Sequence, residues 1–369
     1  MKIIVDGRCL TGKATGVSNY LIDAINSLSK FENFEFYILS HKKIQSEVTC
    51  RFYEKSKIKF IEAPFYLFKK NGLIWFFFKL PFLVNSLEGD IFWGPGQVLP
   101  FFLKSCIKKM VTIHDFVFIY YSYTMSIKSW IENKVFTSQS IKKSDYIWCV
   151  SDYTKNELIK LYPNRKCNTI FVGSGIDFSR FRKMFLSEEK KKEIISKYNV
   201  SNPFILCVGT LEPRKNFQFL LQLMPRIVSE KISLLVVGSK GWGKSIKVAP
   251  EESSYVKYTG YVDIEELVML YNIADLYVSS SLNEGFGLPI LEAVVCGCPI
   301  LTPYNSAMIE LGSTFGTTVT GWDEDVWVES ILKLIQGDKV INQNNREELL
   351  KYDWDIIARG FKDYLDSDV

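Results

Sequence analysis

Short apolar runs alternate with amphipathic segments along most of this chain. Apolar runs of this length predict buried strands, and apolar residues recurring every three or four positions between them predict helices. The expected strands cover residues 3–5, 34–39, 90–93, 110–113, 146–150 and 169–172 in the first half, and residues 204–208, 232–237, 256–259, 274–278 and 300–301 in the second. Strands that alternate with helices form parallel sheets with helices on both faces. The pattern therefore predicts an α/β fold class.

The expected helices follow those strands. The first starts near Val17, Ser151 caps a second that runs to Leu161, and Asp263 caps a third over residues 264–272. Further helices are expected over residues 127–141, from residue 217 onward and over residues 354–365. The last of these is amphipathic, so we expect it to pack back on one of the domains.

A polar and charged stretch over residues 181–198 separates two series of strands. With 369 residues, the chain is long enough for two or three domains that each bury a core. We predict an N-terminal domain over 1–180, a second domain over 181–350 and a C-terminal helix within 351–369 that crosses back to the first domain. Two such domains in tandem would bind a ligand in the cleft between them, at the carboxyl ends of their strands.

Charge is distributed unevenly along the chain. The net charge is only +4, but residues 1–180 carry 25 Lys and Arg against 15 Asp and Glu, whereas residues 181–369 carry 20 against 26. A basic half indicates an anionic partner, such as a phospholipid surface or a lipid-linked phosphate. Because no nucleic-acid-reading motif accompanies the basic half, we expect no nucleic acid partner.

Residues 65–82 combine aromatic and basic side chains. The aromatic residues are Phe65, Tyr66, Phe68, Trp75, Phe76, Phe77, Phe78 and Phe82, and the basic ones are Lys69, Lys70 and Lys79. One interpretation is a face that touches lipid headgroups or a polyprenyl-type phosphate. The other is a helix whose aromatic side chains form core contacts with the sheet. The sequence leaves both open.

Neither metal binding nor a membrane span is predicted. The eight Cys lack zinc-site spacing, and the chain contains only two His, so we expect reduced thiols and no metal site. The N-terminal residues 1–8 contain no apolar segment of the signal-peptide kind. The most apolar run, residues 73–84, is too short to cross a bilayer. We expect a cytoplasmic protein that is soluble or peripheral on the membrane.

The stretch Glu284–Ala293, EGFGLPILEA, carries the strongest chemical signal. Gly285 and Gly287 allow close approach of the backbone to a ligand, and Pro289 suits the first turn of a helix. Free amides at the start of that helix would form an anion site. Glu284 and Glu292 would accept hydrogen bonds from sugar hydroxyls on either side of it. The alternative is a glycine turn before an amphipathic helix with two solvated glutamates.

Other loops that follow expected strands are also candidates. The segment Gly12–Val17 opens a helix and could present amides to a phosphate, although it lacks the G-x-G-x-x-G pattern of dinucleotide-binding proteins. His114, at a strand end, is either a sugar-binding imidazole or a structural histidine. The loop Gly238–Gly243 and the pair Gly260–Tyr261 are places where a nucleobase could rest against the backbone.

The remaining loop is Gly209–Asn216, GTLEPRKN. Two cations, Arg214 and Lys215, are expected at the start of a helix, where they are unfavourable for the helix dipole. This placement makes sense if both bind a diphosphate and neutralise it as it departs. A salt bridge with Glu212 is the competing explanation.

The order of these motifs resembles the GT-B-fold retaining glycosyltransferases of family 4, also called group 1. The resemblance rests on EGFGLPILEA (284–293), GTLEPRKN (209–216), GYVDIEELVMLYNIADLYVSSS (260–281) and TIHD (112–115), supported by GDIFWGPGQVLP (89–100) and VSDYTKNEL (150–158). It covers nearly the whole chain. Residues 306–310, SAMIE, depart from the Leu-Pro-Glu usual in relatives, which affects the expected shape of the loop that follows. The resemblance implies two Rossmann-like domains that face each other across a cleft.

The resemblance also implies roles for individual residues. Arg214 and Lys215 match a diphosphate-binding pair, Glu284 an acid that contacts the donor sugar, and Glu292 an acid that holds the donor ribose. His114 matches a histidine beside the transferred sugar. The residues expected to bind the donor are Gly16, Val17, Arg214, Lys215, Gly260, Tyr261, Glu284, Gly285, Phe286, Gly287, Leu288 and Glu292, and those expected to act in catalysis are His114, Arg214, Lys215 and Glu284.

The function implied is transfer of a hexose from a nucleotide-sugar, with retention at the anomeric carbon and without a metal or other cofactor. The acceptor would be a lipid-linked glycan in the assembly of O-antigen or capsule. We favour mannose from GDP-mannose, and a UDP- or dTDP-sugar is the alternative. A phosphorylase or sucrose-type synthase would have little use for a long basic acceptor face. A catalytically silent nucleotide-binding subunit is the alternative from another class.

Overall fold

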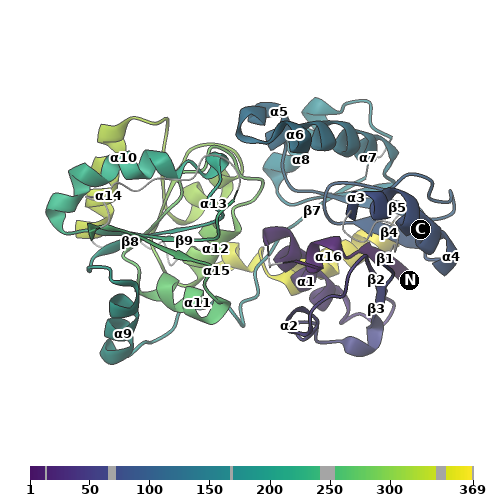
Figure 1. Cartoon of the computed structure of the whole chain (residues 1–369), viewed down its shortest axis with the longest axis horizontal. Coiled ribbons are helices and arrows are strands. Elements are labelled where there is room, and N and C mark those ends of the chain that lie inside the picture. Colours follow the sequence, from purple (N-terminus) through teal and green to yellow (C-terminus); the bar gives the residue numbers. More distant parts are fainter. Residues whose placement is uncertain (13–14, 65–71, 167–168, 242–253, 338–345, 368–369) are drawn as a thin grey trace. The chain divides into compact units, whose positions relative to one another are not determined.

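The computed structural model describes the chain except for residues 13–14, 65–71, 167–168, 242–253, 338–345 and 368–369 (Figure 1). Parts of the predicted glycine loops, Cys167 and the first half of the aromatic and basic stretch therefore lie outside the described residues. The chain divides into two compact units. Unit 1 comprises Met1–Phe116, Ile131–Gly175 and Lys351–Val369, and unit 2 comprises Val117–Trp130 and Ile176–Leu350.

In the described residues, unit 1 is built on a seven-stranded parallel sheet with the order β3-β2-β1-β4-β5-β6-β7. Its strands are β1 (Lys2–Asp6), β2 (Glu35–Ser40), β3 (Ile58–Glu62), β4 (Ile91–Gly94), β5 (Lys108–Ile113), β6 (Tyr146–Cys149) and β7 (Ile170–Val172). The predicted parallel sheet is confirmed. Strand β3 was not predicted; it is an edge strand in which only Ile58 is buried, and charged residues interrupt its apolar ones.

Helices surround this sheet. They are α1 (Gly16–Leu28), α2 (Ser46–Thr49), α3 (Gly72–Ile74), α4 (Leu80–Leu87), α7 (Ser138–Lys143), α8 (Asp152–Leu161) and α16 (Trp354–Asp366). A π-helical turn, η4 (Trp75–Lys79), joins α3 to α4. The helix expected over 127–141 consists of α6 (Ile127–Glu132), a second π-helical turn, η6 (Asn133–Thr137), and α7.

Aromatic packing holds the C-terminal helix in unit 1. Trp93 of β4 and Trp148 of β6 stack with their rings nearly parallel and their centroids 5.5 Å apart. Phe361 of α16 is fully buried and stacks on Trp148 at 4.4 Å. Trp354, at the start of α16, meets the edge of Tyr20 from α1. The amphipathic pattern of residues 354–365 therefore corresponds to a helix that buries its apolar face in this unit.

Unit 2 contains, among its described residues, a six-stranded parallel sheet with the order β10-β9-β8-β11-β12-β13. Its strands are β8 (Phe204–Val208), β9 (Ser233–Val237), β10 (Val256–Gly260), β11 (Leu276–Val278), β12 (Ile300–Pro303) and β13 (Thr317–Val319). The chain builds outward from β8 to β10 and then returns to add β11 on the other side of β8. The switch point of the sheet therefore lies between β8 and β11.

Unit 2 contains the following helices in its described residues. They are α5 (Val117–Tyr120), α6, α9 (Glu188–Tyr198), α10 (Phe217–Ile227), α11 (Ile264–Ile273), α12 (Leu288–Val295), α13 (Met308–Phe315), α14 (Glu324–Gln336) and α15 (Arg346–Leu350). Figure 1 shows α10 and α14 on one face and α11 on the other. Residues 188–198, expected in the segment that links the domains, form α9, which Ser187 caps and whose first turn carries Glu188 and Glu189.

Within the described parts of the chain, no helix is long and apolar enough to cross a membrane.

Candidate active site

Three neighbouring strands of unit 2 carry the candidate site. β11 pairs with β8 on one side and with β12 on the other, and all three run parallel. Their carboxyl ends therefore lie side by side, and the loops that follow them meet at one edge of the sheet. These loops cover residues 209–216, 279–287 and 304–307. This edge adjoins the switch point, where open α/β sheets bind their ligands.

Arg214 and Lys215 lie in a 3-10 turn, η7 (Pro213–Lys215), that precedes α10. The helix α10 begins at Phe217, as predicted, and Asn216, in a left-handed conformation with φ of 52°, separates the turn from it. The backbone of the turn is tied to the loop after β11. Ser280 Oγ donates to the carbonyl of Lys215 at 2.9 Å, and the Leu282 amide donates to the carbonyl of Arg214 at 2.8 Å.

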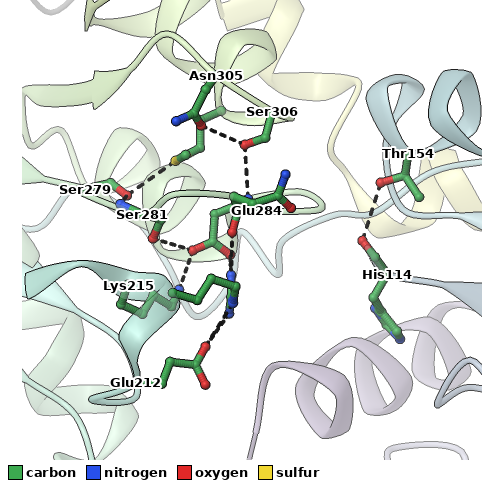
Figure 2. A network of polar contacts seen from close by, with 12 residues as sticks. His114, Thr154, Glu212, Lys215, Ser279, Ser281, Glu284, Asn305 and Ser306 are labelled. Atoms are coloured by element: carbon green, nitrogen blue, oxygen red, sulfur yellow. Dashed lines mark hydrogen bonds and ion pairs between the residues drawn. The ribbon is translucent and has the colours of Figure 1, made fainter. Parts of the chain in front are cut away.

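Both cations bind the carboxylate of Glu284 (Figure 2). Arg214 Nη1 donates to Glu284 Oε2 at 2.8 Å, and Lys215 Nζ donates to Glu284 Oε1 at 2.6 Å. Arg214 also donates from Nε and Nη2 to Glu212 Oε1, at 3.0 and 2.6 Å. The salt bridge with Glu212 that competed with the diphosphate interpretation is thus present, alongside the contact with Glu284.

Burial and charge set the ionisation of Glu284. Only 12% of its side chain is exposed. Burial alone would raise the pKa of this carboxyl, but Arg214 and Lys215 and the hydrogen bonds from Lys215 and Ser281 lower it to about 2. Glu284 is therefore ionised at neutral pH. Two carboxylates and two cations share this nearly buried space, and their formal charges cancel.

Two serines hold Glu284, and neither contact was predicted from the sequence. Ser281 Oγ donates to Glu284 Oε1 at 2.6 Å, and the Glu284 amide donates to Ser306 Oγ at 3.0 Å. Ser306 has a φ of 49°, a left-handed conformation that is uncommon outside glycine. It lies in the segment whose departure from the family pattern had left the loop shape uncertain. Only the short run of serines at 279–281 could have pointed to Ser281.

Gly287 is the N-cap residue of the helix that follows Glu284. Its φ of 99° lies where a side chain would strain the backbone, so glycine is required at this position. The helix α12 starts at Leu288 with Pro289 in its first turn, as predicted. Gly285 and Phe286 lie in the loop between Glu284 and the helix. The N-terminus of α12 thus follows directly from the loop that holds Glu284, which keeps the predicted anion site and the acid in one segment.

Glu292 lies on α12 and binds a different partner. Tyr271 of α11 donates its hydroxyl to Glu292 Oε2 at 2.8 Å. Burial and the nearby Glu292 carboxylate raise the pKa of Tyr271, so the phenol keeps its proton. This contact was not predicted, although Tyr271 lies in the motif 260–281. The ribose-binding role of Glu292 stays a prediction.

Gly260 and Tyr261 follow β10 in the same unit. Gly260 has a φ of 73°, its carbonyl accepts a hydrogen bond from the Gly238 amide at 2.9 Å, and Tyr261 is exposed. The two glycine-containing loops predicted to lie near a nucleobase are therefore in contact through their backbones. Binding of a base there stays a prediction.

His114, Gly16 and Val17 belong to unit 1. α1 begins at Gly16, and Thr15 and Ser18 form a capping box at its start. Tyr20, one turn further on, lies edge-on to the His114 ring with 5.3 Å between centroids. The structure therefore connects the start of α1 with the end of β5 through Tyr20. These residues therefore form one part of unit 1, whereas the Arg214–Glu284 cluster belongs to unit 2.

Backbone groups surround His114. Its ring Nε2 lies 2.6 Å from the carbonyl oxygen of Pro95, which can only accept, so Nε2 carries the proton in this contact. The Gln97 side chain accepts from the His114 amide at 3.0 Å. Burial lowers the pKa of His114, against the effects of Pro95 and Asp115. The neutral ring with an acceptor at Nδ1 suits either interpretation made from the sequence, structural or sugar-binding.

Within the described residues, no three His, Cys, Asp or Glu side chains come together as a metal-binding group would require.

Comparison with known proteins finds a family match within the second unit. Residues 202–337 match the family model described as "Glycosyl transferases group 1". The O-antigen chain mannosyltransferase B of Escherichia coli is 29% identical over 267 residues, which is 69% of this chain and 68% of that protein. The serotype-specific mannosyltransferase WbdA of Escherichia coli is 26% identical over 200 residues, but this alignment spans 50% of the chain and only 22% of WbdA.

Solved structures agree on the fold. Anabaena Alr3699/HepE in complex with UDP-glucose superimposes over the whole of both chains with a TM-score of 0.74 at 17% identity. WaaG, a glycosyltransferase involved in lipopolysaccharide biosynthesis, matches 98% of this chain and 95% of its own with a TM-score of 0.67 at 13% identity. The chain therefore has the GT-B fold, as the sequence motifs predicted.

Two replacements of Ser306 distinguish the stability contributed by its hydrogen bond from the cost of its left-handed backbone. We expect Ser306→Ala to lower the free energy of unfolding of unit 2 by about 1–2 kcal/mol, because it leaves the Glu284 amide without its acceptor. Ser306→Gly loses the same bond but relieves the left-handed conformation, so its loss should be smaller than that of Ser306→Ala. Chemical denaturation of both variants measures the difference. Equal losses would show that the conformation of Ser306 stores no strain.

Lowering the pH tests the ion pairs of Glu284. Because its pKa is lowered to about 2 in the folded state, the ionised carboxylate stabilises the protein above the ordinary glutamate pKa, and this contribution is lost as the pH falls toward 2. Glu284→Gln should be less stable than the parent at pH 7, and the difference should shrink between pH 5 and pH 3. Thermal unfolding across this range measures it. A difference that does not change with pH would contradict the assigned pairing.

Proposed function

We propose that this chain, a glycosyltransferase with a group 1 domain in a GT-B fold, transfers a hexose with retention from a nucleotide-sugar to a lipid-linked glycan. The family match over 202–337 and the relatedness to O-antigen mannosyltransferases support the general activity. The observation that carries the finer proposal is the nearly buried contact of Arg214 and Lys215 with Glu284, next to the first turn of α12.

The two cations suit a diphosphate. Guanidinium and ammonium groups bind phosphate oxygens through charge-assisted hydrogen bonds, and they do so most strongly where water is excluded. Arg214 and Lys215 have 16% and 12% of their side chains exposed, and the carboxylates of Glu212 and Glu284 already occupy them. In the proposed complex, the donor diphosphate competes with these carboxylates for the cations. Glu284 is then released to accept hydrogen bonds from hydroxyls of the donor sugar.

The proposed reaction forms and breaks one bond at the anomeric carbon. The bond from that carbon to the diphosphate oxygen breaks, and the electron pair leaves with the diphosphate. The acceptor oxygen attacks from the same side, and its proton passes to the departing phosphate oxygen. Arg214, Lys215 and the amides at the start of α12 stabilise the developing negative charge, which in this proposal makes a metal ion unnecessary. In this proposal Glu284 orients the sugar and takes up no proton, because the proton of the acceptor passes to the departing phosphate oxygen.

Three further residues complete the proposed donor site. Glu292, held by the Tyr271 hydroxyl, accepts hydrogen bonds from the donor ribose. His114 hydrogen-bonds a hydroxyl of the transferred sugar through its unprotonated ring nitrogen. Gly16, at the start of α1, faces the phosphates through its backbone amide. Because His114 and Gly16 belong to unit 1, their part in the proposal requires the two units to close around the donor.

We propose GDP-mannose as the donor, on the strength of the mannosyltransferase relatives. A UDP- or dTDP-sugar is the alternative donor. Because the chain is similar in fold to a protein solved with UDP-glucose, the experiment below includes these sugars. The proposed acceptor is a lipid-linked glycan in surface polysaccharide assembly, which would place the enzyme in the cytoplasm at the inner face of the membrane.

A panel of donors tests the proposal. Purified protein is incubated with GDP-mannose and with UDP- and dTDP-hexoses, and release of the nucleoside diphosphate is followed. We expect release from GDP-mannose, and a loss of kcat/KM of at least about 100-fold in Lys215→Ala and in Glu284→Ala, because each removes a charged contact that stabilises the transition state.

Arg226→Ala is the matched control, since Arg226 also pairs with a carboxylate of unit 2, Asp325, but at a half-exposed surface. It should retain the parent activity. Release from a UDP- or dTDP-sugar alone would replace GDP-mannose in the proposal. If nucleotides bind but no donor is turned over, the chain is the catalytically silent nucleotide-binding subunit. Undiminished release by Lys215→Ala would contradict the proposed mechanism.

A further inference from the structure

The aromatic and basic stretch of unit 1 is divided between core and surface. Trp75 and Phe76 of η4 are buried, so the core interpretation made from the sequence holds for this pair. Phe78 and Phe82 are 69% and 66% exposed. They are four residues apart along the continuous helix of η4 and α4, and side chains at that spacing share a face. Two large apolar rings therefore project into solvent from one side of this helix.

A third exposed ring is held beside this face. Asn85 of α4 donates from Nδ2 to the Phe102 carbonyl at 2.9 Å, and its Oδ1 accepts from the Lys104 amide at 2.9 Å. Asn85 follows Phe82 by three residues, so it lies on the same side of α4. Phe102, whose own carbonyl is held in this way, has a left-handed φ of 66° and is 81% exposed. A strained backbone that presents an apolar ring to water indicates a function for that ring.

A rigid aromatic layer supports the exposed rings. Phe77 stacks on Phe101 with 5.0 Å between centroids and lies 4.6 Å from Phe136. Phe101 in turn meets Phe102 at 6.2 Å. The neighbours of the exposed rings in sequence are thus packed against each other. The rings Phe78, Phe82 and Phe102, which we call the aromatic anchor, project from an ordered base.

Lysines surround the aromatic anchor. Lys79 Nζ lies 5.8 Å from the ring centre of Phe82, and Lys143 Nζ lies 5.3 Å from that of Phe101. Lys104 is exposed next to Phe102. A cavity of about 130 Å³ beside Phe102 is lined by Lys109 and Lys143, among others. The nearby acid Asp145 already pairs with Lys109 and Lys166, which leaves a positive balance around the rings.

From this combination we infer that the aromatic anchor inserts into an anionic phospholipid bilayer while the surrounding lysines contact lipid phosphates. Aromatic rings in a basic setting favour the interface of such a membrane, because the rings enter the acyl boundary and the cations remain at the headgroups. The aromatic anchor would be the surface through which the proposed enzyme contacts the membrane. The proposed function explains why such a contact would be useful, but the observations that support the contact do not depend on it. The contact can therefore be disproved while the transferase activity stands.

Vesicle binding tests the inference directly. The full chain is sedimented with phosphatidylcholine vesicles that contain or lack phosphatidylglycerol. We expect binding to the anionic vesicles, weakening with added salt, and much weaker binding to the neutral ones. Replacing all three rings by serine should lower the partition coefficient at least about 100-fold, because each exposed phenylalanine contributes roughly tenfold when it enters the membrane. Asn85→Ala, which releases the Phe102 loop, should reduce binding by less.

Phe185→Ser provides the matched control. Phe185 is 99% exposed but lies in the segment before α9, away from the aromatic anchor in the sequence, and its replacement should leave vesicle binding unchanged. Circular dichroism and donor turnover without vesicles should be equal in all variants. Two outcomes would overturn the inference. The first is undiminished binding of the triple variant to anionic vesicles. The second is a parent protein that binds no vesicles and forms a dimer in solution, together with a triple variant that does not dimerise. That result would assign the rings to contact with a second copy of the chain.

Discussion

The candidate site depends on the pairing of one carboxylate with two cations. Glu284 binds Arg214 and Lys215 at 2.8 and 2.6 Å in a nearly buried space, and its pKa falls to about 2 despite that burial. Buried charges of this kind are retained only when they are paired, because an unpaired one would cost several kcal/mol. The loops after β8, β11 and β12 are therefore held together by the cluster itself. In the proposed complex, the diphosphate takes the place of a carboxylate beside Arg214 and Lys215, so one anion is exchanged for another.

Much of this arrangement could be predicted from the sequence, and the reasons are physical. The strands that carry the site are central and apolar on both faces, so they are evident as runs of Val, Ile and Leu, and parallel strands bring their carboxyl ends to one edge. EGFGLPILEA and GTLEPRKN stood out because glycine, proline and charged residues follow directly after buried strands. The edge strand β3 was missed because Lys59 and Glu62 interrupt its apolar residues, and α9 was missed because its polar composition is also that of a linker.

The contacts that complete the site could not be predicted. Ser306 binds the Glu284 amide from a left-handed conformation, and Tyr271 binds Glu292 from another helix. Neither depends on a local pattern, because each joins residues that only the packing of the sheet brings together. The same holds in unit 1, where Asn85 anchors Phe102 across 17 positions of sequence. Composition indicated a basic and aromatic region there, and only the fold separates its buried rings from its exposed ones.

The claim that Arg214 and Lys215 receive a diphosphate is tested most directly by calorimetric titration of the protein with GDP, UDP and dTDP. The account predicts that the best-bound of these nucleoside diphosphates loses at least about tenfold in affinity in Lys215→Ala, because a charge-assisted contact with phosphate is removed. The Arg226→Ala control should bind it as the parent does. Equal affinity of Lys215→Ala and the parent would contradict the account, because the cations would then serve only to pair with Glu284.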